Sequence, residues 1–423
     1  MGDHDTYWKA DGSYLPPVKP HTKAKHQILA DYIKNWIVTL CGNNMGKRKT
    51  VTLIDGFCGG GMYIDPENDN ELWEGSPIRM IKMVERGLEI VKYEKSKFNY
   101  DLNAKFIFVD SKPEHIECLK LQMQNAGFEE YIHNSEKCEF ICGKFEPLVE
   151  RLVSEVRMRR GSSFFFLDPF GYTDVTMASI RKVISLGKSE IIYTFMIDFI
   201  RRFLSEREGL LKRAFTDILE ADGYFMPSSD YHIPDQQDYL RNETLRLFRN
   251  RGGAHYVYSF ALLPNRTIVE YYLVHLASSS TAQRVIKNAL WEHNNIDLIY
   301  QFNRGVTGLG FSAPEYYERE TKIFNIKEDN IRASIESLNN ELMPVIYNYE
   351  DGIPFKELHV RTIQTNPSPI SHYIGYVDEQ RDMGEIEVWR NGKITKAKQL
   401  QPGDIVVKSR QGKLFDLKNF KRE

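Results

Sequence analysis

Strand-like and helix-like segments alternate along the first half of this chain, and that alternation limits its possible folds more than any other feature. Runs of β-branched and aromatic residues predict buried strands over residues 50–55, 104–110, 138–142, 162–168 and 190–195. Apolar residues at three- and four-residue spacing predict intervening helices over residues 113–126, 146–158 and 175–186. Strands joined by helices make right-handed crossovers, so we expect a mostly parallel, doubly wound α/β sheet.

Two long strands then follow each other with no helix between them. They cover residues 254–262 and 267–277, and a short Leu-Pro-Asn-Arg segment joins them as a hairpin. A parallel sheet that ends in one antiparallel hairpin is typical of the Rossmann-like fold of S-adenosylmethionine-dependent (SAM-dependent) methyltransferases. Simple dinucleotide-binding folds do not end in this way. We therefore predict this fold for residues 21–310, with a helical insertion over residues 196–250.

The C-terminal part of the sequence predicts a separate small domain. Helical patterns cover residues 329–347 and 354–365, and a hairpin of residues 385–390 and 393–398 follows across an Asn-Gly turn. Helix, helix, hairpin favours a winged-helix domain over residues 320–423. Basic residues on its expected recognition helix and wing suit phosphate contacts, although a solvated surface explains them equally well. These residues are Lys356, His359, Arg361, Arg390, Lys393, Lys396 and Lys398.

Composition excludes several classes of protein. With 423 residues, 42% apolar and 27% charged, the chain is ordinary globular protein with room for two or three domains. Its formal charge of −2 argues against a tail-driven polyanion binder, although a local basic patch can still contact nucleic acid. Residues 1–20 form a polar arm without a signal-peptide core, and no apolar run reaches 18 residues. Five scattered cysteines fit free thiols, so we expect a cytoplasmic protein without a membrane partner.

The sharpest motif is Asp55-Gly56-Phe57-Cys58-Gly59-Gly60-Gly61, directly after the first predicted strand. Consecutive glycines permit a tight turn and let the backbone approach a ligand where a Cβ atom would collide. A plain tight turn would use the same residues. The pattern D-x-F-x-G-x-G resembles motif I of DNA and RNA methyltransferases, whose loop holds the methionine part of SAM. It is not a phosphate loop, because no Gly-Lys-Ser/Thr follows.

An acidic residue, Asp110, ends the second predicted strand. A carboxylate at that position can accept hydrogen bonds from both ribose hydroxyls of an adenosine, as in dinucleotide folds. An equally good explanation is that Asp110 is a helix N-cap ahead of Pro113. Asp110 is far from the glycines in sequence, because an insertion of residues 63–90 that contains Gly75-Ser76-Pro77 separates them.

The fourth predicted strand ends in Asp168-Pro169-Phe170-Gly171-Tyr172, which resembles the [D/N/S]-P-P-[Y/F] element of methyltransferases that modify exocyclic amino groups. There a carboxylate and the proline carbonyl accept the two amine hydrogens, and an aromatic ring, here Phe170 or Tyr172, stacks on the extruded base. Phe170 replaces the second proline. The element also resembles that of tRNA guanosine-N2 dimethylating enzymes, and a purely structural turn is the remaining alternative.

Together, Pro20–His26, Asp55–Gly61, Gly75–Pro77 and Asp168–Gly171 resemble the three-Cys-motif partner protein family, over about residues 20–295. That family has a methyltransferase-like core and is named for neighbouring genes that encode radical-SAM-like proteins. The same order of elements resembles the bacterial large-subunit ribosomal RNA adenine-N6 methyltransferase. The resemblance implies that SAM is the cofactor. Its implied cofactor contacts include Lys25, His26 and Ser76.

The resemblance also marks one departure from the ribosomal enzyme. That enzyme has an acidic residue after its third strand, where this chain has Cys142-Gly143, so a contact to the adenine of SAM lacks its usual carboxylate here. The Cys138-x3-Cys142 spacing lacks a second pair of ligands, and we expect no metal.

Two main hypotheses of function follow. In the first, the chain methylates an exocyclic amine of a nucleic-acid base, most readily adenine N6, in RNA or DNA. Asp168 then orients the amine, Asp55, Phe57, Gly59 and Gly61 shape the methionine pocket, and Asp110 holds the ribose. In the second, the chain keeps the fold with reduced catalysis and works with a three-Cys-motif protein, in defence against phage. A protein or small-molecule methyltransferase is the weaker third alternative.

Overall fold

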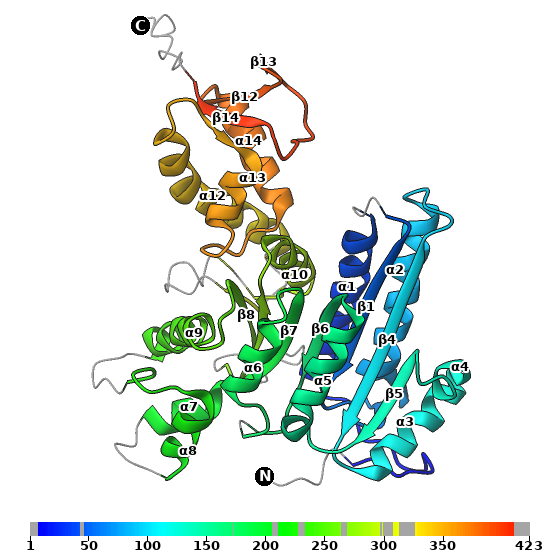
Figure 1. Ribbon diagram of the computed structural model, residues 1–423. Helices are drawn as coiled ribbons and strands as arrows, with labels where there is room; N and C mark the ends of the chain where they lie inside the picture. Colours follow the sequence, from blue (N-terminus) through cyan, green and yellow to red (C-terminus); the bar gives the residue numbers. More distant parts are fainter. Residues whose placement is uncertain are drawn as a thin grey trace, which may run out of the picture. The chain divides into compact units, whose positions relative to one another are not determined.

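The computed structural model describes residues 7–42, 46–171, 173–204, 210–226, 233–263, 269–296, 298, 308–312 and 326–409. The chain divides into two compact units (Figure 1). The first contains Met1–Asn294 and Gly310–Glu320, and the second contains Asn295–Leu309 and Thr321–Glu423. Each unit is described by itself below.

The first unit is built around an eight-stranded sheet with the strand order β10-β8-β9-β7-β6-β1-β4-β5. Strands β1, β4, β5, β6 and β7 pair in parallel, whereas β9 is antiparallel to both β7 and β8. This arrangement confirms the predicted Rossmann-like fold, including its antiparallel hairpin. The strands are β1 (Arg48–Asp55), β4 (Asp101–Asp110), β5 (Cys138–Cys142), β6 (Ser162–Leu167), β7 (Ser189–Met196), β8 (Tyr256–Leu263), β9 (Tyr271–Ala277) and β10 (Leu309–Ser312).

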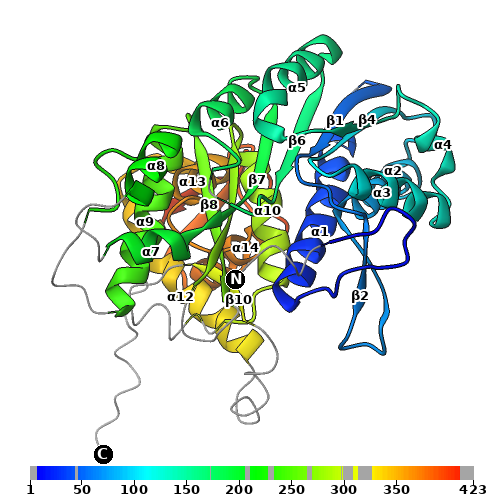
Figure 2. The ribbon, with the colours of Figure 1, turned by 90° about the horizontal axis from the view of Figure 1, so that it is seen from below.

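Helices cover both faces of this sheet (Figures 1 and 2). On one face, α1 (Pro20–Gly42) packs against α2 (Ser76–Tyr93) and α10 (Ser280–Glu292). On the other face lie α5 (Phe145–Arg159) and α6 (Met177–Ile184). Two further helices, α3 (Pro113–Asn125) and α4 (Glu129–Ile132), connect β4 to β5. The predicted helical insertion contains α7 (Ile197–Leu204), α8 (Leu210–Leu219) and α9 (Ile233–Asn250).

Strands β1 and β4 become more buried toward their carboxyl ends. In β1 the first three residues are partly exposed and the last five, Val51–Asp55, are buried, and β4 changes in the same way. The β-branched and aromatic side chains of the runs that predicted these strands form the core between the helical layers, which is why local pattern identified them. The carboxyl ends of β4, β1 and β6, which are neighbours in the sheet, therefore meet deep in the protein.

The insertion after the glycines contains a hairpin that the sequence analysis missed, β2 (Met62–Asp65) and β3 (Glu71–Glu74). The N-terminal arm runs alongside it: the Val18 amide donates to the Ile64 carbonyl at 2.8 Å, and the Ile64 amide donates to the Pro16 carbonyl at 3.0 Å. Although the arm is polar in composition, Trp8 and Val18 are among its fully buried side chains. The arm is therefore part of the packed unit from residue 7 onward.

The second unit has its own core and a four-stranded sheet in the order β11-β14-β12-β13. Its elements are α12 (Ile326–Tyr347), β11 (Ile353–Pro354), α13 (Phe355–Thr362), α14 (Ile370–Met383), β12 (Ile386–Arg390), β13 (Lys393–Ile394) and β14 (Ile405–Lys408). Both predicted helices are present, and the predicted hairpin forms with a second strand of only Lys393–Ile394, whereas α14, β11 and β14 were missed. The buried face of α14 includes His372 and Gln380, so its hydrophobic periodicity is blurred.

Two global properties complete the description. Across the described ranges, no helix is both long and apolar enough to cross a membrane. All five cysteines are free thiols, four of them buried and Cys142 exposed.

Candidate active site

Three carboxylates that the sequence places at separate strand ends lie along one edge of the sheet. Asp55 ends β1, Asp110 ends β4, and Asp168 directly follows β6, and β1 pairs with both neighbours. Asp55 and Asp110 are buried, and Asp168 is about one-fifth exposed at its side chain. Burial raises the pKa of Asp55 to about 7, opposed by hydrogen bonds from Ser76 and Phe57 and reinforced by the charges of Asp168 and Asp110.

The glycine loop that follows Asp55 is tied to both neighbouring strands. The Gly56 amide donates to the Phe166 carbonyl at 2.9 Å, and the Cys58 amide donates to the Val109 carbonyl at 2.9 Å. Gly59 and Gly61 have φ values of +58° and +79°, which glycine adopts without strain. The loop is thus a rigid turn between the ends of β4 and β6.

The insertion returns to this loop and extends the site. The Gly75 amide donates to the Gly61 carbonyl at 2.9 Å, which holds the start of α2 beside the glycines. Ser76, the first residue of α2, is buried there and hydrogen-bonds Asp55. The Gly-Ser-Pro segment predicted to help hold the cofactor therefore lies next to the glycine loop.

Asp110 organises the loops around it. Its carboxylate accepts hydrogen bonds from the Gly59 amide at 3.0 Å and from the Lys112 amide at 2.9 Å, and it contacts His115 Nδ1 at 3.0 Å. These contacts fix both the glycine loop and the start of α3. The other predicted role of Asp110, contact with the ribose of the cofactor, stays a prediction. For that contact the Asp110 carboxylate would have to use its remaining lone pairs or give up one of its present donors.

Asp168 is paired with Lys25, which lies in the first turns of α1. The Lys25 ammonium is 2.7 Å and 2.5 Å from the two carboxylate oxygens. Burial by itself raises the pKa of Asp168, but the charge and hydrogen bonds of Lys25 outweigh it and hold that pKa below the ordinary value. Asp168 is therefore an ionised hydrogen-bond acceptor at neutral pH. The resemblance assigned Lys25 to the cofactor, whereas its contact here is with the predicted catalytic carboxylate.

The residues after Asp168 offer an aromatic surface. Pro169 is buried, whereas Phe170 exposes 57% of its surface. The Gly171 amide donates to the Asp174 carboxylate at 3.1 Å and closes the turn. Tyr172, the other predicted stacking residue, lies outside the described residues.

The remaining predicted residues surround this centre. His26 is buried and its Nδ1 accepts a hydrogen bond from Trp73 Nε1 at 3.1 Å. Burial, with the nearby charges of Arg79 and Lys25, lowers the pKa of His26 to about 3, so it is neutral. Phe57 is half-buried against Phe145, with ring centroids 5.9 Å apart.

The end of the third parallel strand lies beside the end of the second. Cys142 is exposed at the tip of β5, and the Gly143 amide donates to the Asp110 carbonyl at 2.8 Å. This is where the resemblance would put the adenine of SAM, and Cys142 brings no charge to it.

Sequence reasoning missed three aromatic residues of the site. Tyr63 on β2 is close enough to the strand-end carboxylates that burial and their charges raise its pKa. His21 stacks on Tyr271, with ring centroids 5.5 Å apart. Trp8 packs against the glycine loop, where a Cβ atom on Gly60 would lie 2.3 Å from its ring. Tyr63 could have been found, because it follows the glycine loop by two residues and so lies at the same end of the strands. No local sequence pattern marks Trp8.

The charge balance of the site bears on which cofactor fits it. Asp55, Asp110 and Asp168 are offset by one ammonium, that of Lys25, so the site has an excess of negative charge. SAM carries a sulfonium and an α-ammonium group, and such a cation complements this edge. The donor set therefore fits SAM. Within the described part of the chain, no cluster of three or more acidic, histidine or cysteine side chains could hold a metal ion.

Comparisons with known proteins are distant. No protein-family model matches the sequence, and no curated protein is similar to it. Among solved structures, a Legionella pneumophila protein of the family DUF519 is 12% identical, with 66% of this chain and 94% of that chain covered and a TM-score of 0.35. A loganic acid methyltransferase with SAH is 10% identical, with 76% and 85% covered and a TM-score of 0.25. The methyltransferase PKMT2 of Rickettsia typhi, in complex with AdoHcy, is also 10% identical, with 94% and 66% covered and a TM-score of 0.25.

At these scores the fold assignment rests on strand order and direction within the sheet itself. The resemblances to the three-Cys-motif partner family and to the ribosomal RNA methyltransferase stay predictions.

Proposed function

We propose that this chain is a SAM-dependent methyltransferase that modifies an exocyclic amino group of a nucleic-acid base, with adenine N6 favoured. The observation that carries the proposal is Asp168, an ionised and partly exposed carboxylate at a strand end. It is followed by a rigid proline and an exposed phenyl ring, and it shares its sheet edge with the glycine loop. An amine acceptor, a base-stacking surface and a cofactor loop are thus adjacent.

An exocyclic amine is a poor nucleophile because its lone pair is delocalised into the ring. Asp168 would accept one amine hydrogen and the Pro169 carbonyl the other, which draws the nitrogen toward sp³ geometry and aims its lone pair. Lys25 keeps Asp168 ionised and fixed, so Asp168 acts as an orienting acceptor more than as a base. Phe170 would stack on the extruded base. Positioning of this kind supplies much of the rate acceleration.

When bound, SAM supplies an electrophilic methyl group on a sulfonium. The residues that would hold its methionine part are Asp55, Phe57, Gly59 and Gly61, with Ser76 closing the loop. Asp110 would contact the ribose, and Cys142 would lie near the adenine. His26, neutral and fixed by Trp73, would support the wall beside Lys25.

The second candidate is a partner protein with reduced catalysis, working with a three-Cys-motif protein in phage defence. Two observations favour it. Asp110 already meets three donors from its own chain, and Cys142 provides no carboxylate for the adenine. Under this proposal the chain belongs to the three-Cys-motif partner family and its main ligand is another protein.

Isothermal titration with SAM and, separately, with S-adenosylhomocysteine tests the first proposal. We expect micromolar binding that Gly59→Arg abolishes, because the arginine side chain would collide with Trp8 and fill the loop. Gly42→Arg is the matched control, since Gly42 ends α1 and no non-neighbouring atom lies within 4 Å of a Cβ atom there. Methyl transfer to RNA and DNA oligonucleotides, followed with a labelled methyl donor, completes the test. No binding at millimolar ligand would refute the first proposal and favour the second.

A further inference from the structure

A positively charged loop of the second unit lies outside the candidate active site. We call residues 391–404 the wing; they connect β12, through the short β13, to β14. Three lysines lie on the wing, at 393, 396 and 398, and no acidic residue occurs between 391 and 403. All three lysines are exposed, and none forms an ion pair with any residue that the structure describes.

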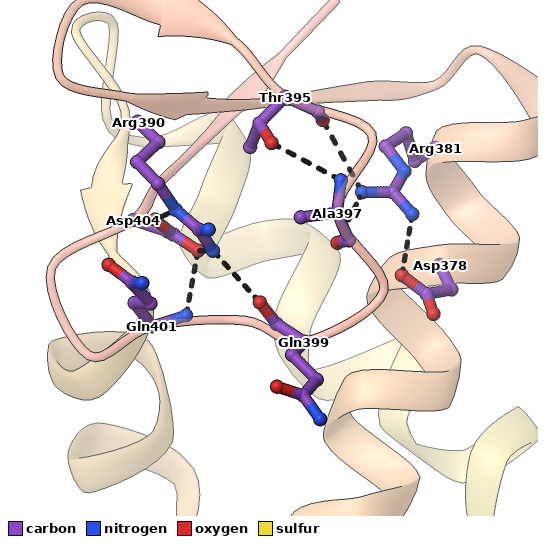
Figure 3. Close-up of polar contacts among 8 residues, drawn as sticks. All are labelled: Asp378, Arg381, Arg390, Thr395, Ala397, Gln399, Gln401 and Asp404. Atoms are coloured by element: carbon purple, nitrogen blue, oxygen red, sulfur yellow. Dashed lines mark hydrogen bonds and ion pairs between the residues drawn. The ribbon is translucent and has the colours of Figure 1, made fainter.

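The wing is held in one shape by buried and half-buried polar contacts, shown in Figure 3. The Arg390 guanidinium donates to both carboxylate oxygens of Asp404 at 2.7 Å and to the Gln399 carbonyl at 2.8 Å. Asp404 is buried and also accepts from the Gln401 amide at 2.7 Å. A bidentate pair of this kind fixes orientation as well as distance. One side of the loop is therefore anchored through Arg390.

A second arginine anchors the other side of the wing. Arg381, on α14, donates to the Thr395 carbonyl at 3.4 Å and to the Ala397 carbonyl at 3.2 Å, and it is itself held by Asp378 at 2.8 Å. The backbone on both sides of Lys396 is thus fixed. Lysines on a fixed loop lose less conformational freedom when they bind a polyanion than lysines on a mobile one.

The base of the wing adds an exposed apolar pair. Trp389 and Ile394 are directly opposite each other across β12 and β13, and they expose 37% and 58% of their surfaces. An exposed tryptophan beside lysines is a combination suited to contact with both the bases or sugars and the phosphates of a nucleic acid.

The helix that precedes the wing has the opposite charge. In helix-turn-helix proteins this helix enters the major groove, but the partly or fully exposed charged side chains of α14 include Asp378, Glu379 and Asp382. Its one arginine, Arg381, is used to hold the wing. Phosphates would therefore be repelled from α14 and attracted to the wing.

The helix expected from sequence to make this contact, α13, is also a poor candidate. His359 is buried in the core, and Arg361 is paired with Glu357 at 2.7 Å. Of the three basic residues predicted on α13, Lys356 alone is exposed without an ion pair within the described residues. The expectation that α13 is a recognition helix is not supported by these side chains, because its cations are buried, paired or isolated.

We propose that the wing, and not a helix, is the surface by which the second unit binds nucleic acid. Lys393, Lys396 and Lys398 contact phosphates, and Trp389 with Ile394 packs on the exposed sugars or bases. The inference rests on the proposed nucleic-acid substrate and adds which element grips it. Phosphate contacts carry no sequence information, so binding through the wing is independent of sequence and depends steeply on salt.

The test compares two triple variants of the full chain. The wing variant is Lys393→Gln, Lys396→Gln and Lys398→Gln. The control variant, Lys47→Gln, Lys95→Gln and Lys188→Gln, removes the same charge from exposed lysines that precede β1, follow α2 and precede β7. Fluorescence anisotropy measures the Kd of each variant for single-stranded and duplex RNA and DNA oligonucleotides, each in two unrelated sequences. The salt concentration is varied from about 50 to about 200 mM, a range over which phosphate contacts change the affinity strongly.

Each lost phosphate contact should flatten the slope of log Kd against log salt by about 0.9 for duplex DNA or about 0.7 for a single strand. The wing variant should therefore lose about 2 to 3 from its slope and roughly a hundredfold in affinity near 0.1 M salt. The control should match the wild type. The four oligonucleotide types then distinguish RNA from DNA, and single strands from duplexes.

Two results would overturn the inference. If the wing variant binds with the wild-type slope, the lysines do not contact phosphate. If the wild type binds no oligonucleotide, the wing faces a protein partner instead. The SAM titration is independent of both results. If the chain binds SAM and the wing variant binds nucleic acid like the wild type, the methyltransferase proposal stands and the wing proposal fails. If the chain does not bind SAM and the wing variant binds nucleic acid more weakly than the wild type, only the methyltransferase proposal fails.

Discussion

The amino ends and the carboxyl ends of the sheet's parallel strands, called here the amino edge and the carboxyl edge, each hold a carboxylate that contacts α1, but they balance its charge in opposite ways. At the amino edge, Glu190 near the start of β7 accepts hydrogen bonds from the hydroxyl of Tyr32 and from Trp36 Nε1, the latter at 2.9 Å. His275 Nε2 lies 3.1 Å from the Tyr32 hydroxyl. At the carboxyl edge three carboxylates lie at neighbouring strand ends, and within the described residues Lys25 is the one lysine that pairs with any of them, through Asp168.

This difference distinguishes a carboxylate that stabilises the fold from carboxylates that can bind a ligand. At the amino edge one carboxylate meets neutral donors, and burial with the Glu190 charge raises the pKa of Tyr32, so that ring stays a neutral donor. A carboxylate whose oxygens both meet donors in this way stabilises a fold and needs no ligand. At the carboxyl edge burial, reinforced by the charges of Asp168 and Asp110, raises the pKa of Asp55, and a cationic ligand would relieve this excess of negative charge.

The largest expected effect comes from removing one carboxylate at each edge. Asp168→Ala should lower kcat for methyl transfer at least about a hundredfold, as the loss of an orienting hydrogen bond does, while SAM binding persists. Glu190→Ala should leave kcat per folded molecule unchanged and lower the free energy of unfolding by about 2 to 4 kcal/mol, because Tyr32 and Trp36 lose their buried acceptor.

Single-turnover methylation and urea denaturation of both variants measure these effects. Asp168→Ala also leaves Lys25 without its partner, so its rate is normalised to folded protein. Equal loss of kcat in the two variants would erase the functional distinction between the edges.

The next effect concerns pH. Asp55 has a pKa of about 7 in the folded chain and about 4 when unfolded, so the unfolded state releases its proton first as pH rises. The contribution of Asp55 to the free energy of unfolding is therefore fully present below about pH 4 and is lost between about pH 4 and pH 7. Asp55→Asn cannot ionise and can still accept from the Phe57 amide.

The Asp55→Asn variant should accordingly match the wild type near pH 4 and exceed it by up to about 4 kcal/mol at pH 8. Urea denaturation at both pH values measures the difference. Glu190→Gln is the control at the other edge. A stability gain for Asp55→Asn that does not change with pH would mean that Asp55 is ionised throughout. Burial and the neighbouring carboxylates would then not raise its pKa.

The sequence was informative wherever a local pattern decides the structure. The buried strands follow from β-branched and aromatic runs, and Asp55, Asp110 and Asp168 could be assigned to one edge because parallel strands of a doubly wound sheet end together. Contacts between distant segments left no such pattern. Trp8 lies about fifty residues before the loop it covers, and the core face of α14 contains histidine and glutamine, so neither was predictable from spacing.

The smallest expected effect tests that unpredicted contact of Trp8, which closes the carboxyl edge and has no counterpart at the amino edge. A Cβ atom on Gly60 would lie 2.3 Å from Trp8 Cγ and 2.4 Å from Cδ1, so the ring, whose Nε1 donates to the Met62 carbonyl, must move. Gly60→Ala should cost about 1 to 3 kcal/mol of unfolding free energy. In a Trp8→Ala background the same change should cost almost nothing, a coupling of about 1 to 3 kcal/mol.

Urea denaturation of the two single variants and the double variant gives this coupling, with Gly403→Ala, where the space is open, as the control. Additive costs would mean that the arm does not rest on the glycine loop in solution, and that the carboxyl edge is open where this structure closes it. A measured coupling would instead make residues 7–19 part of the site, because a cofactor that contacts Gly59 and Gly60 would then approach a loop whose position depends on Trp8.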